Sequence, residues 1–156
     1  MAAEGTGTGE TVGGCVCGAV EILVPRLGHE ISACFCDVCR VWGGGVQMGL
    51  DAPAETVEVT GPVKTWPTAI AERAWCDICG THLWFRYTAG RDAGYLELTP
   101  GLFPDAGGGH LARVNYADRA PEGYDMTGPG EIARVPAAQY EAENPHLQSE
   151  VRHDGT

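Results

Sequence analysis

Cysteine placement is the strongest constraint on how this chain folds. All seven cysteines fall in three tight clusters: Cys15-Val16-Cys17, Cys34-Phe35-Cys36-Asp37-Val38-Cys39 and Cys76-Asp77-Ile78-Cys79. Such short spacings are typical of zinc sites, in which four thiolates close a structural site and three leave one position open. The spacing therefore predicts two zinc ions per chain, one bound by four sulfurs and one bound by three.

Glycines after two of the clusters indicate which cysteines share a site. Gly18 follows the first cluster and Gly80 follows the third, and glycine permits the tight turn that such a cluster needs. This parallel predicts a closed, structural zinc site formed by Cys15, Cys17, Cys76 and Cys79. The middle cluster then forms the open zinc site, with the ligands Cys34, Cys36 and Cys39.

Disulfides and redox chemistry explain the clusters less well. An odd number of cysteines, with 36 residues between Cys39 and Cys76, does not suit a disulfide-stapled miniprotein. A redox pair of Cys36 and Cys39 would be expected beside a βαβ pattern, and the sequence there has no strong helical periodicity.

The rest of the chain predicts a single all-β domain. Its 156 residues are 44% hydrophobic, and 23 glycines and 10 prolines divide it into short segments rich in Val, Ile, Leu and aromatic residues. The predicted strands are Ala19–Val24, Glu30–Cys34, Val46–Leu50, Thr56–Thr60, Ile70–Trp75, Leu83–Thr88, Tyr95–Leu98 and His110–Tyr116. Only Ala137–Glu143 and Pro67–Ala71 have the pattern of a helical turn or two.

The two ends are polar, so we expect residues 1–13 to be a flexible segment and residues 141–156 a flexible tail. The zinc domain is then expected to span residues 14–140.

No targeting segment is visible near the N-terminus and no apolar run approaches the length of a membrane span, so we expect the protein in the reducing cytosol. A formal charge of −11 argues against nucleic acid and anionic membranes as partners. The sequence does not indicate an oligomeric state.

Three segments resemble the glutathione-dependent formaldehyde-activating enzymes, a family that includes the centromere protein V domain. They are Gly14-Cys15-Val16-Cys17-Gly18-Ala19-Val20, then Cys34 to Arg40 with Gly44-Gly45 after it, then Arg73-Ala74-Trp75-Cys76-Asp77-Ile78-Cys79-Gly80-Thr81. Weaker similarity follows at Gly101 to Asp105 and at His110-Leu111, so the resemblance covers roughly residues 13 to 125.

The resemblance implies a β-tent fold shared with Mss4-like proteins, one four-cysteine zinc, one three-cysteine zinc and carbon–sulfur lyase activity. Two positions depart from the family pattern. Phe35 stands where the family usually has histidine, and Trp66 to Ala71 lacks the usual paired serines.

An open three-sulfur zinc could take a thiol, which it would deprotonate, or a carbonyl, which it would polarise. Either event suits the addition of a small thiol, such as glutathione, to an aldehyde. Candidate substrate contacts are Arg40 and Arg73 beside the clusters, the N–H groups of Gly44 and Gly45 in a glycine loop, and His110 for acid–base work. His82 is expected in the core or on the surface, and Phe35 and Trp42 together in the core or the pocket wall.

Three functions remain open at this point. The first is a zinc-dependent carbon–sulfur lyase or adduct-forming enzyme acting on a small thiol or its adduct. The second is a noncatalytic binding module with two structural zinc ions. The third is a metal or redox sensor that loses zinc when Cys34, Cys36 and Cys39 are oxidised.

Overall fold

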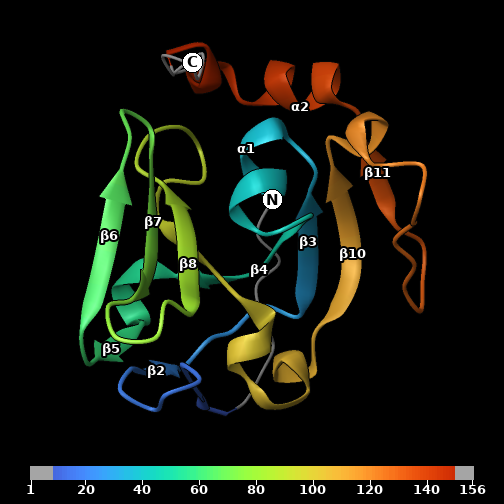
Figure 1. Ribbon diagram of the computed structural model, residues 1–156. Helices are drawn as coiled ribbons and strands as arrows, with labels where there is room; N and C mark the ends of the chain where they lie inside the picture. The colour runs from blue at the N-terminus through green and yellow to red at the C-terminus, as the bar shows by residue number, and fades with distance from the viewer. Residues whose placement is uncertain (1–8, 150–156) are drawn as a thin grey trace.

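The computed structural model describes residues 9–149, which form two β-sheets and two short α-helices (Figure 1). No helix in this part of the chain is long and apolar enough to cross a membrane. The strands are β1 Thr11–Gly14, β2 Glu21–Val24, β3 Glu30–Cys34, β4 Gln47–Pro53, β5 Glu58–Thr60, β6 Val63–Pro67, β7 Ala71–Cys76, β8 His82–Tyr87, β9 Tyr95–Leu98, β10 His110–Asn115 and β11 Ala133–Val135. The helices are α1 Asp37–Trp42 and α2 Ala137–Glu143, and the 3₁₀ turns are η1 Ala54–Thr56, η2 Pro100–Leu102, η3 Pro104–Gly108, η4 Ala117–Arg119 and η5 Pro145–Ser149.

The larger sheet has eight strands in the order β11-β10-β3-β4-β9-β8-β7-β6, and the smaller has three in the order β1-β2-β5. β10 runs parallel to β3 and β11, while the other neighbouring strands are antiparallel. The prediction of an all-β fold is confirmed.

Successive side chains of a strand point to opposite faces of the sheet, so the central strands give the larger sheet one face on the core and one face away from it. On β3, Ile31 and Ala33 point into the main core, where they join Ile22 and Val24 of the smaller sheet. Ser32 and Cys34 therefore point to the opposite face. Figure 1 shows α1 and α2 at the same end of the molecule, at the top of the view.

All eight predicted strands exist, with ends that differ by a few residues. β1, β6, β11 and α1 were not predicted, because they are short and lack a clear apolar period. The helical turn expected at Ala137–Glu143 is confirmed as α2, whereas the turn expected at Pro67–Ala71 is wrong. That segment contains the end of β6 and the start of β7, which pair with each other.

Both boundaries of the domain also need correction. β1 begins at Thr11, inside the segment expected to be flexible, because its backbone pairs with β2 along residues 11–14. After residue 140, α2 continues to Glu143 and η5 follows, with Leu147 packed on a second apolar cluster formed by Ile70, Ala71, Phe85 and Tyr87. The rest of both predicted flexible segments, residues 1–8 and 150–156, lies outside the described residues.

Candidate functional site

The four cysteines predicted to form the closed site do come together. Cys15 and Cys17 lie in the loop between β1 and β2, Cys76 and Cys79 lie at the turn between β7 and β8, and their four sulfurs are all within 4.8 Å of one another. The Sγ atoms are 3.5 Å apart for Cys15 and Cys17 and 3.8 Å apart for Cys17 and Cys76. A tetrahedron with Zn–S bonds of about 2.3 Å needs sulfurs about 3.8 Å apart. These four cysteines, which we call the quartet, therefore fit zinc.

Local hydrogen bonds favour the thiolate form of Cys79, whereas the neighbouring Cys15 thiol raises the pKa of Cys17. The hydroxyl of Thr81 lies 3.1 Å from Cys79 Sγ, and this contact, followed by the Thr81 N–H, lowers the pKa of Cys79 to about 5. The N–H of Val20 donates to Cys15 Sγ at 3.2 Å. Gly18 and Gly80 have φ of 80° and 77°, as the turn prediction required.

The second cluster, which we call the trio, consists of Cys34, Cys36 and Cys39. Cys34 ends β3, Cys36 caps the N-terminus of α1 and Cys39 lies in its first turn, with the three sulfurs within 4.8 Å of one another. The N–H of Cys39 donates to Cys36 Sγ at 3.4 Å. Hydrogen bonds from the thiols of Cys34 and Cys39 lower the pKa of Cys36 most strongly. Three soft sulfurs at this spacing fit a zinc ion.

The described residues give the trio no fourth ligand of its own. Among residues 9–149, no further cysteine, histidine, aspartate or glutamate places a ligand atom within the same 4.8 Å group. Phe35, between two of the cysteines, is 1% exposed and fills the core, with its ring 6.0 Å from that of Tyr124. Phe35 is therefore a core residue, as the sequence allowed.

Arg73 lies beside the trio, as its place in the sequence had suggested. Its side chain is 4% exposed, and Nη2 donates to Cys39 Sγ at 3.7 Å. The guanidinium carbon lies 5.4 Å from the ring centre of Trp42 and 4.8 Å from that of Phe85. A desolvated cation in this position offsets the negative charge of the three thiolates.

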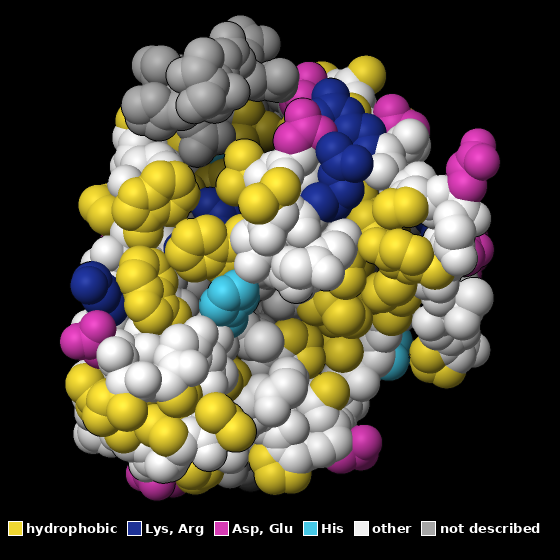
Figure 2. Space-filling model, viewed as in Figure 1, with side chains coloured by type: hydrophobic (Ala, Val, Ile, Leu, Met, Phe, Trp, Pro, Cys, Tyr) yellow, Lys and Arg dark blue, Asp and Glu magenta, His cyan; other side chains and the backbone are white. Residues whose placement is uncertain are grey.

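Trp42 is therefore not paired with Phe35 but belongs to an aromatic group that covers Arg73. Its ring stacks on Trp66 at 5.9 Å and on His82 at 5.3 Å, and Trp75 lies 5.7 Å away. Figure 2 shows apolar side chains (yellow) gathered on this side of the molecule, over β6 to β8.

Arg40, Gly44 and Gly45 follow the trio in sequence but are bonded elsewhere. Arg40 forms a partly exposed ion pair with Asp37, one turn earlier on α1. The N–H groups of Gly44 and Gly45 donate to the carbonyls of Val41 and Arg40, where α1 ends. The oxyanion contact expected from this glycine loop is therefore not available in the structure.

His110 is not brought to the trio. It begins β10 and is the register partner of Glu30, while Asn115 at the other end of β10 is the partner of Cys34. Glu30 and Cys34 are four steps apart along β3, which is about 13 Å at a rise of about 3.3 Å per residue. The exposed side chain and this distance do not support the predicted acid–base role.

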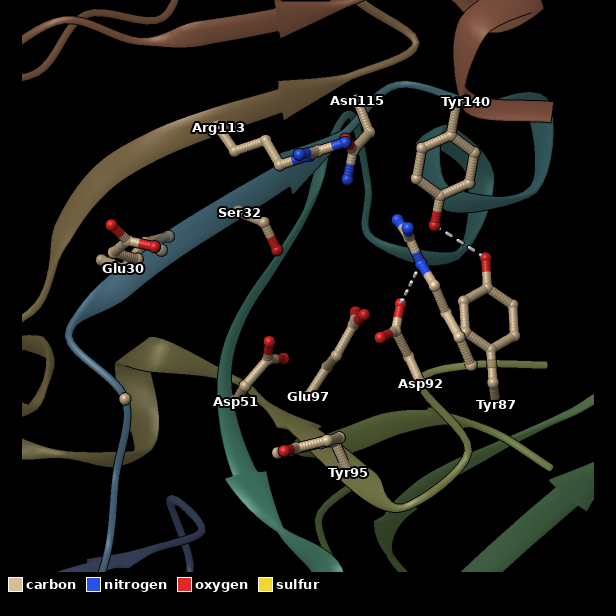
Figure 3. Close-up of a pocket in the computed structure, with 13 residues that line it drawn as sticks. Glu30, Ser32, Asp51, Tyr87, Asp92, Tyr95, Glu97, Arg113, Asn115 and Tyr140 are labelled. Atoms are coloured by element: carbon tan, nitrogen blue, oxygen red, sulfur yellow. Dashed lines mark hydrogen bonds and ion pairs between the residues drawn. The ribbon is translucent and has the colours of Figure 1, made fainter. Parts of the chain in front are cut away.

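A polar cavity adjoins the trio on the same face of the larger sheet. It includes Ser32, which lies two residues before Cys34 on β3, and Asn115, the register partner of Cys34 on β10. Figure 3 shows the side chains of several strands converging on it from below and from one side, with Tyr140 of α2 above. The lining residues are Gly28, Glu30, Ile31, Ser32, Asp51, Tyr87, Arg91, Asp92, Tyr95, Glu97, Arg113, Asn115 and Tyr140.

Two carboxyl groups in this cavity are strongly perturbed. Burial, followed by the charges of Asp51 and Asp92, raises the pKa of Glu97 to about 8. Burial, followed by the charge of Asp92, raises the pKa of Asp51 to about 6. Both shifts disfavour the charged form, as expected where two carboxylates share a partly desolvated space.

Tyr87 and Tyr140 close the cavity on the side of α2, with their hydroxyl oxygens 2.9 Å apart. Burial raises the pKa of both phenols, so both remain protonated. The sequence analysis missed every one of these lining residues. The only available signal was the alternation of polar and apolar residues in β4 and β9, where Asp51 and Glu97 interrupt apolar segments.

Comparison with known families gives a match over two thirds of the chain. The family described as glutathione-dependent formaldehyde-activating enzyme matches residues 10–114. This range contains the quartet, the trio and most of the cavity.

A curated protein and a solved structure are also similar. An uncharacterized lyase of Schizosaccharomyces pombe is 29% identical over 90 residues, which cover 56% of this chain and 66% of that protein, just under two thirds of its length. A crystal structure of a Rhodobacter sphaeroides protein has a TM-score of 0.51 at 19% identity and covers 80% of this chain and 99% of that one. The second similarity concerns the fold alone.

Proposed function

Because this chain belongs to the family of glutathione-dependent formaldehyde-activating enzymes, we propose that it is a carbon–sulfur lyase, or the reverse adduct-forming enzyme. Its substrates would be a small thiol and an aldehyde, or the adduct of the two. The observation that carries this proposal is the trio, an incomplete set of sulfur ligands next to a polar cavity. A purely structural site would be expected to complete its own ligand set.

Two zinc ions would be bound in this account. Cys15, Cys17, Cys76 and Cys79 would hold the structural one, and Cys34, Cys36 and Cys39 the other. Zinc held by the second set would supply Lewis acidity and would favour the thiolate form of an incoming thiol. All seven cysteines are free thiols, so the ligands require a reducing compartment such as the cytosol.

The reaction needs no other cofactor to balance. In the lyase direction, the carbon–sulfur bond of a hydroxyalkyl thioether breaks and sulfur keeps the electron pair. The hydroxyl oxygen loses its proton to solvent as the carbonyl forms, and addition reverses both events.

Arg73 is the residue of this chain best placed to assist. Its buried guanidinium already donates to Cys39 Sγ, so it offsets the negative charge that accumulates at the sulfurs as the substrate thiolate forms. Trp42 and Phe85 on either side of it keep water away and strengthen that interaction.

Turnover of the S-hydroxymethyl adduct of a small thiol by zinc-loaded protein tests the proposal. We expect release of formaldehyde that is zinc-dependent and is lost in Cys36→Ser, a variant that removes one trio ligand and leaves the quartet intact. Asp77→Asn, a change beside the quartet that alters no ligand, is the matched control and should retain activity. Lack of turnover by fully loaded wild-type protein, across thiols of different charge, would identify a binding module instead.

A further inference from the structure

Asp51 and Glu97 form an unpaired carboxylate pair in the cavity. They are register partners on the antiparallel strands β4 and β9, so their side chains leave the same face of the sheet with Cβ atoms about 5 Å apart. Figure 3 shows both carboxyl groups directed into the cavity. Within residues 9–149, neither accepts a hydrogen bond or ion pair from another side chain.

The arginines that line the cavity are already paired with other groups. Arg91 lies 3.6 Å from Asp92 and 3.7 Å from Glu143. Arg113 donates to Asn115 Oδ1 at 2.7 Å and to Glu143 at 3.3 Å. Among residues 9–149, the arginines that line the cavity are thus engaged elsewhere, and the carboxyl groups of Asp51 and Glu97 have no cation paired with them.

Glu97 lies close enough to the trio for one small molecule to reach both. The Glu97 side chain lies against Gly49 of β4, because a Cβ atom added to Gly49 would be only 3.0 Å from Glu97 Cβ. Gly49 pairs with Ser32, and two residues further along the two strands Gln47 pairs with Cys34. Because two residues of a strand span about 7 Å, Gly49, where Glu97 lies, is about 7 Å along the strands from the level of Cys34.

A second group with unused hydrogen-bonding capacity lies next to Cys34, on the neighbouring strand β4. Gln47 is 7% exposed, its Nε2 donates to the carbonyl of Met48, and its Oε1 has no donor in the structure. As the register partner of Cys34, it leaves the sheet on the same face as that cysteine. A buried carbonyl oxygen without a donor is costly unless a ligand supplies one.

We propose that the thiol substrate carries a protonated amine within a few bonds of its sulfur, and that Glu97 and Asp51 bind this amine. This inference rests on the proposed function, since it takes the sulfur to be held at the trio. An ammonium group offers only donors, which matches two carboxylates and the Gln47 amide oxygen. The substrate class is then a small cationic aminothiol or its aldehyde adduct. Glutathione has one ammonium group, but it lies many bonds from the sulfur, and the two carboxylates give that thiol a net negative charge.

The protonation of Glu97 is consistent with this assignment. Burial and the neighbouring Asp51 and Asp92 raise its pKa, and only Arg73 acts in the opposite direction. A bound ammonium group would add an attractive charge, so its binding should release a proton that Glu97 holds in the empty cavity.

Calorimetric titration of the zinc-loaded, full-length protein at pH 7 tests the inference with three thiols of similar size. They are 2-(dimethylamino)ethanethiol, which is cationic and cannot condense with an aldehyde through nitrogen, 2-mercaptoethanol, which is neutral, and 3-mercaptopropionate, which is anionic. We expect the cationic thiol to bind about tenfold more tightly than the neutral one and the anionic thiol to bind weakest. Glu97→Gln should remove the advantage of the cationic thiol, while Glu58→Gln on the smaller sheet should keep it.

The outcomes separate the two proposals. Equal binding of the three thiols, or preference for the anionic one, overturns the inference and leaves the proposed function standing. Preference for the cationic thiol that survives in both Glu97→Gln and Asp51→Asn also overturns it, and the second variant provides this answer if the first does not fold. If no thiol binds, the proposed function fails and the inference fails with it.

Discussion

At the scale of single residues, Arg73 combines a buried position in the sheet with a direct contact to the trio. It occupies the middle of β7, where a buried arginine is costly unless it is paired. Its partners are a cysteine sulfur and two aromatic rings. Because the sulfur belongs to the trio, the cost of burying the cation is offset mainly when the trio carries thiolate charge.

Replacement of Arg73 by methionine should therefore weaken zinc binding at the trio. Methionine keeps the contact with Trp42 and Phe85 but removes the charge and the donor to Cys39, so we expect affinity to fall about 10- to 100-fold. Competition with a chromophoric chelator measures this. Arg86→Met, which removes a partly exposed ion pair with Glu72 on the neighbouring strand, is the control, and equal losses in the two variants would contradict the account.

Glu97 predicts a pH effect on stability. Its pKa of about 8 in the folded protein exceeds the ordinary value of 4.5, so between these values the folded state binds more protons than the unfolded state. Stability is then lost as the pH rises through this window. Glu97→Gln removes this titration. The difference in free energy of unfolding, variant minus wild type, should therefore be about 1 kcal/mol or more larger at pH 9 than at pH 5. Urea unfolding without thiol at both pH values measures the difference, and a constant offset would exclude the expected titration.

At the scale of elements, the functional face depends on short segments packed onto the larger sheet. α1 has six residues, contains Cys39 and is capped by Cys36, and α2 has seven residues and covers the cavity through Tyr140. Helices this short are not stable alone. Their positions are set by contacts with the sheet rather than by their own sequence.

The hydroxyl contact between Tyr87 and Tyr140 should contribute to holding α2 in place. In a double-mutant cycle of Tyr87→Phe and Tyr140→Phe, we expect each single change to destabilise the protein by about 1 kcal/mol and a coupling energy of similar size. Thermal or urea unfolding provides the four free energies. Tyr124→Phe, which removes an exposed hydroxyl bonded to the carbonyl of Gly45, is the control, and additive effects of the tyrosine pair would contradict a direct contact.

Much of the architecture could be predicted from the sequence, because both zinc ligand spacing and strand alternation are local patterns. Spacing alone predicted that Cys34, Cys36 and Cys39 share one site, and the structure brings their sulfurs together. β3 and β9 were predicted with their observed bounds. α1 was missed because six residues give too short a window for periodicity. The cavity was missed for a different reason, since Asp51 and Glu97 meet only through strand pairing across 46 residues.

At the scale of the whole molecule, the quartet joins two parts of the chain that are distant in sequence. It links the loop after β1, which leads into the smaller sheet, to the turn between β7 and β8 in the larger one. Cys15 and Cys76 are buried at the edge of the core that the two sheets share. Metal bound there would contribute folding free energy directly, because the ligands are not assembled in the unfolded chain.

Cys79→Ser should therefore affect the whole molecule, whereas Cys36→Ser should not. We expect loss of the quartet zinc to lower the melting temperature by 10 °C or more, about 3 kcal/mol or more for a chain of this size. Differential scanning calorimetry of the two variants provides the comparison. An unchanged melting temperature in Cys79→Ser would contradict a structural role for the quartet.

The division between one closed and one open sulfur site is tested most directly by native mass spectrometry of freshly prepared, reduced protein. Wild type should carry two zinc ions per chain, and Cys36→Ser should carry one while keeping the circular dichroism spectrum of the folded protein. A single zinc ion in wild type that Cys36→Ser leaves in place would contradict the account.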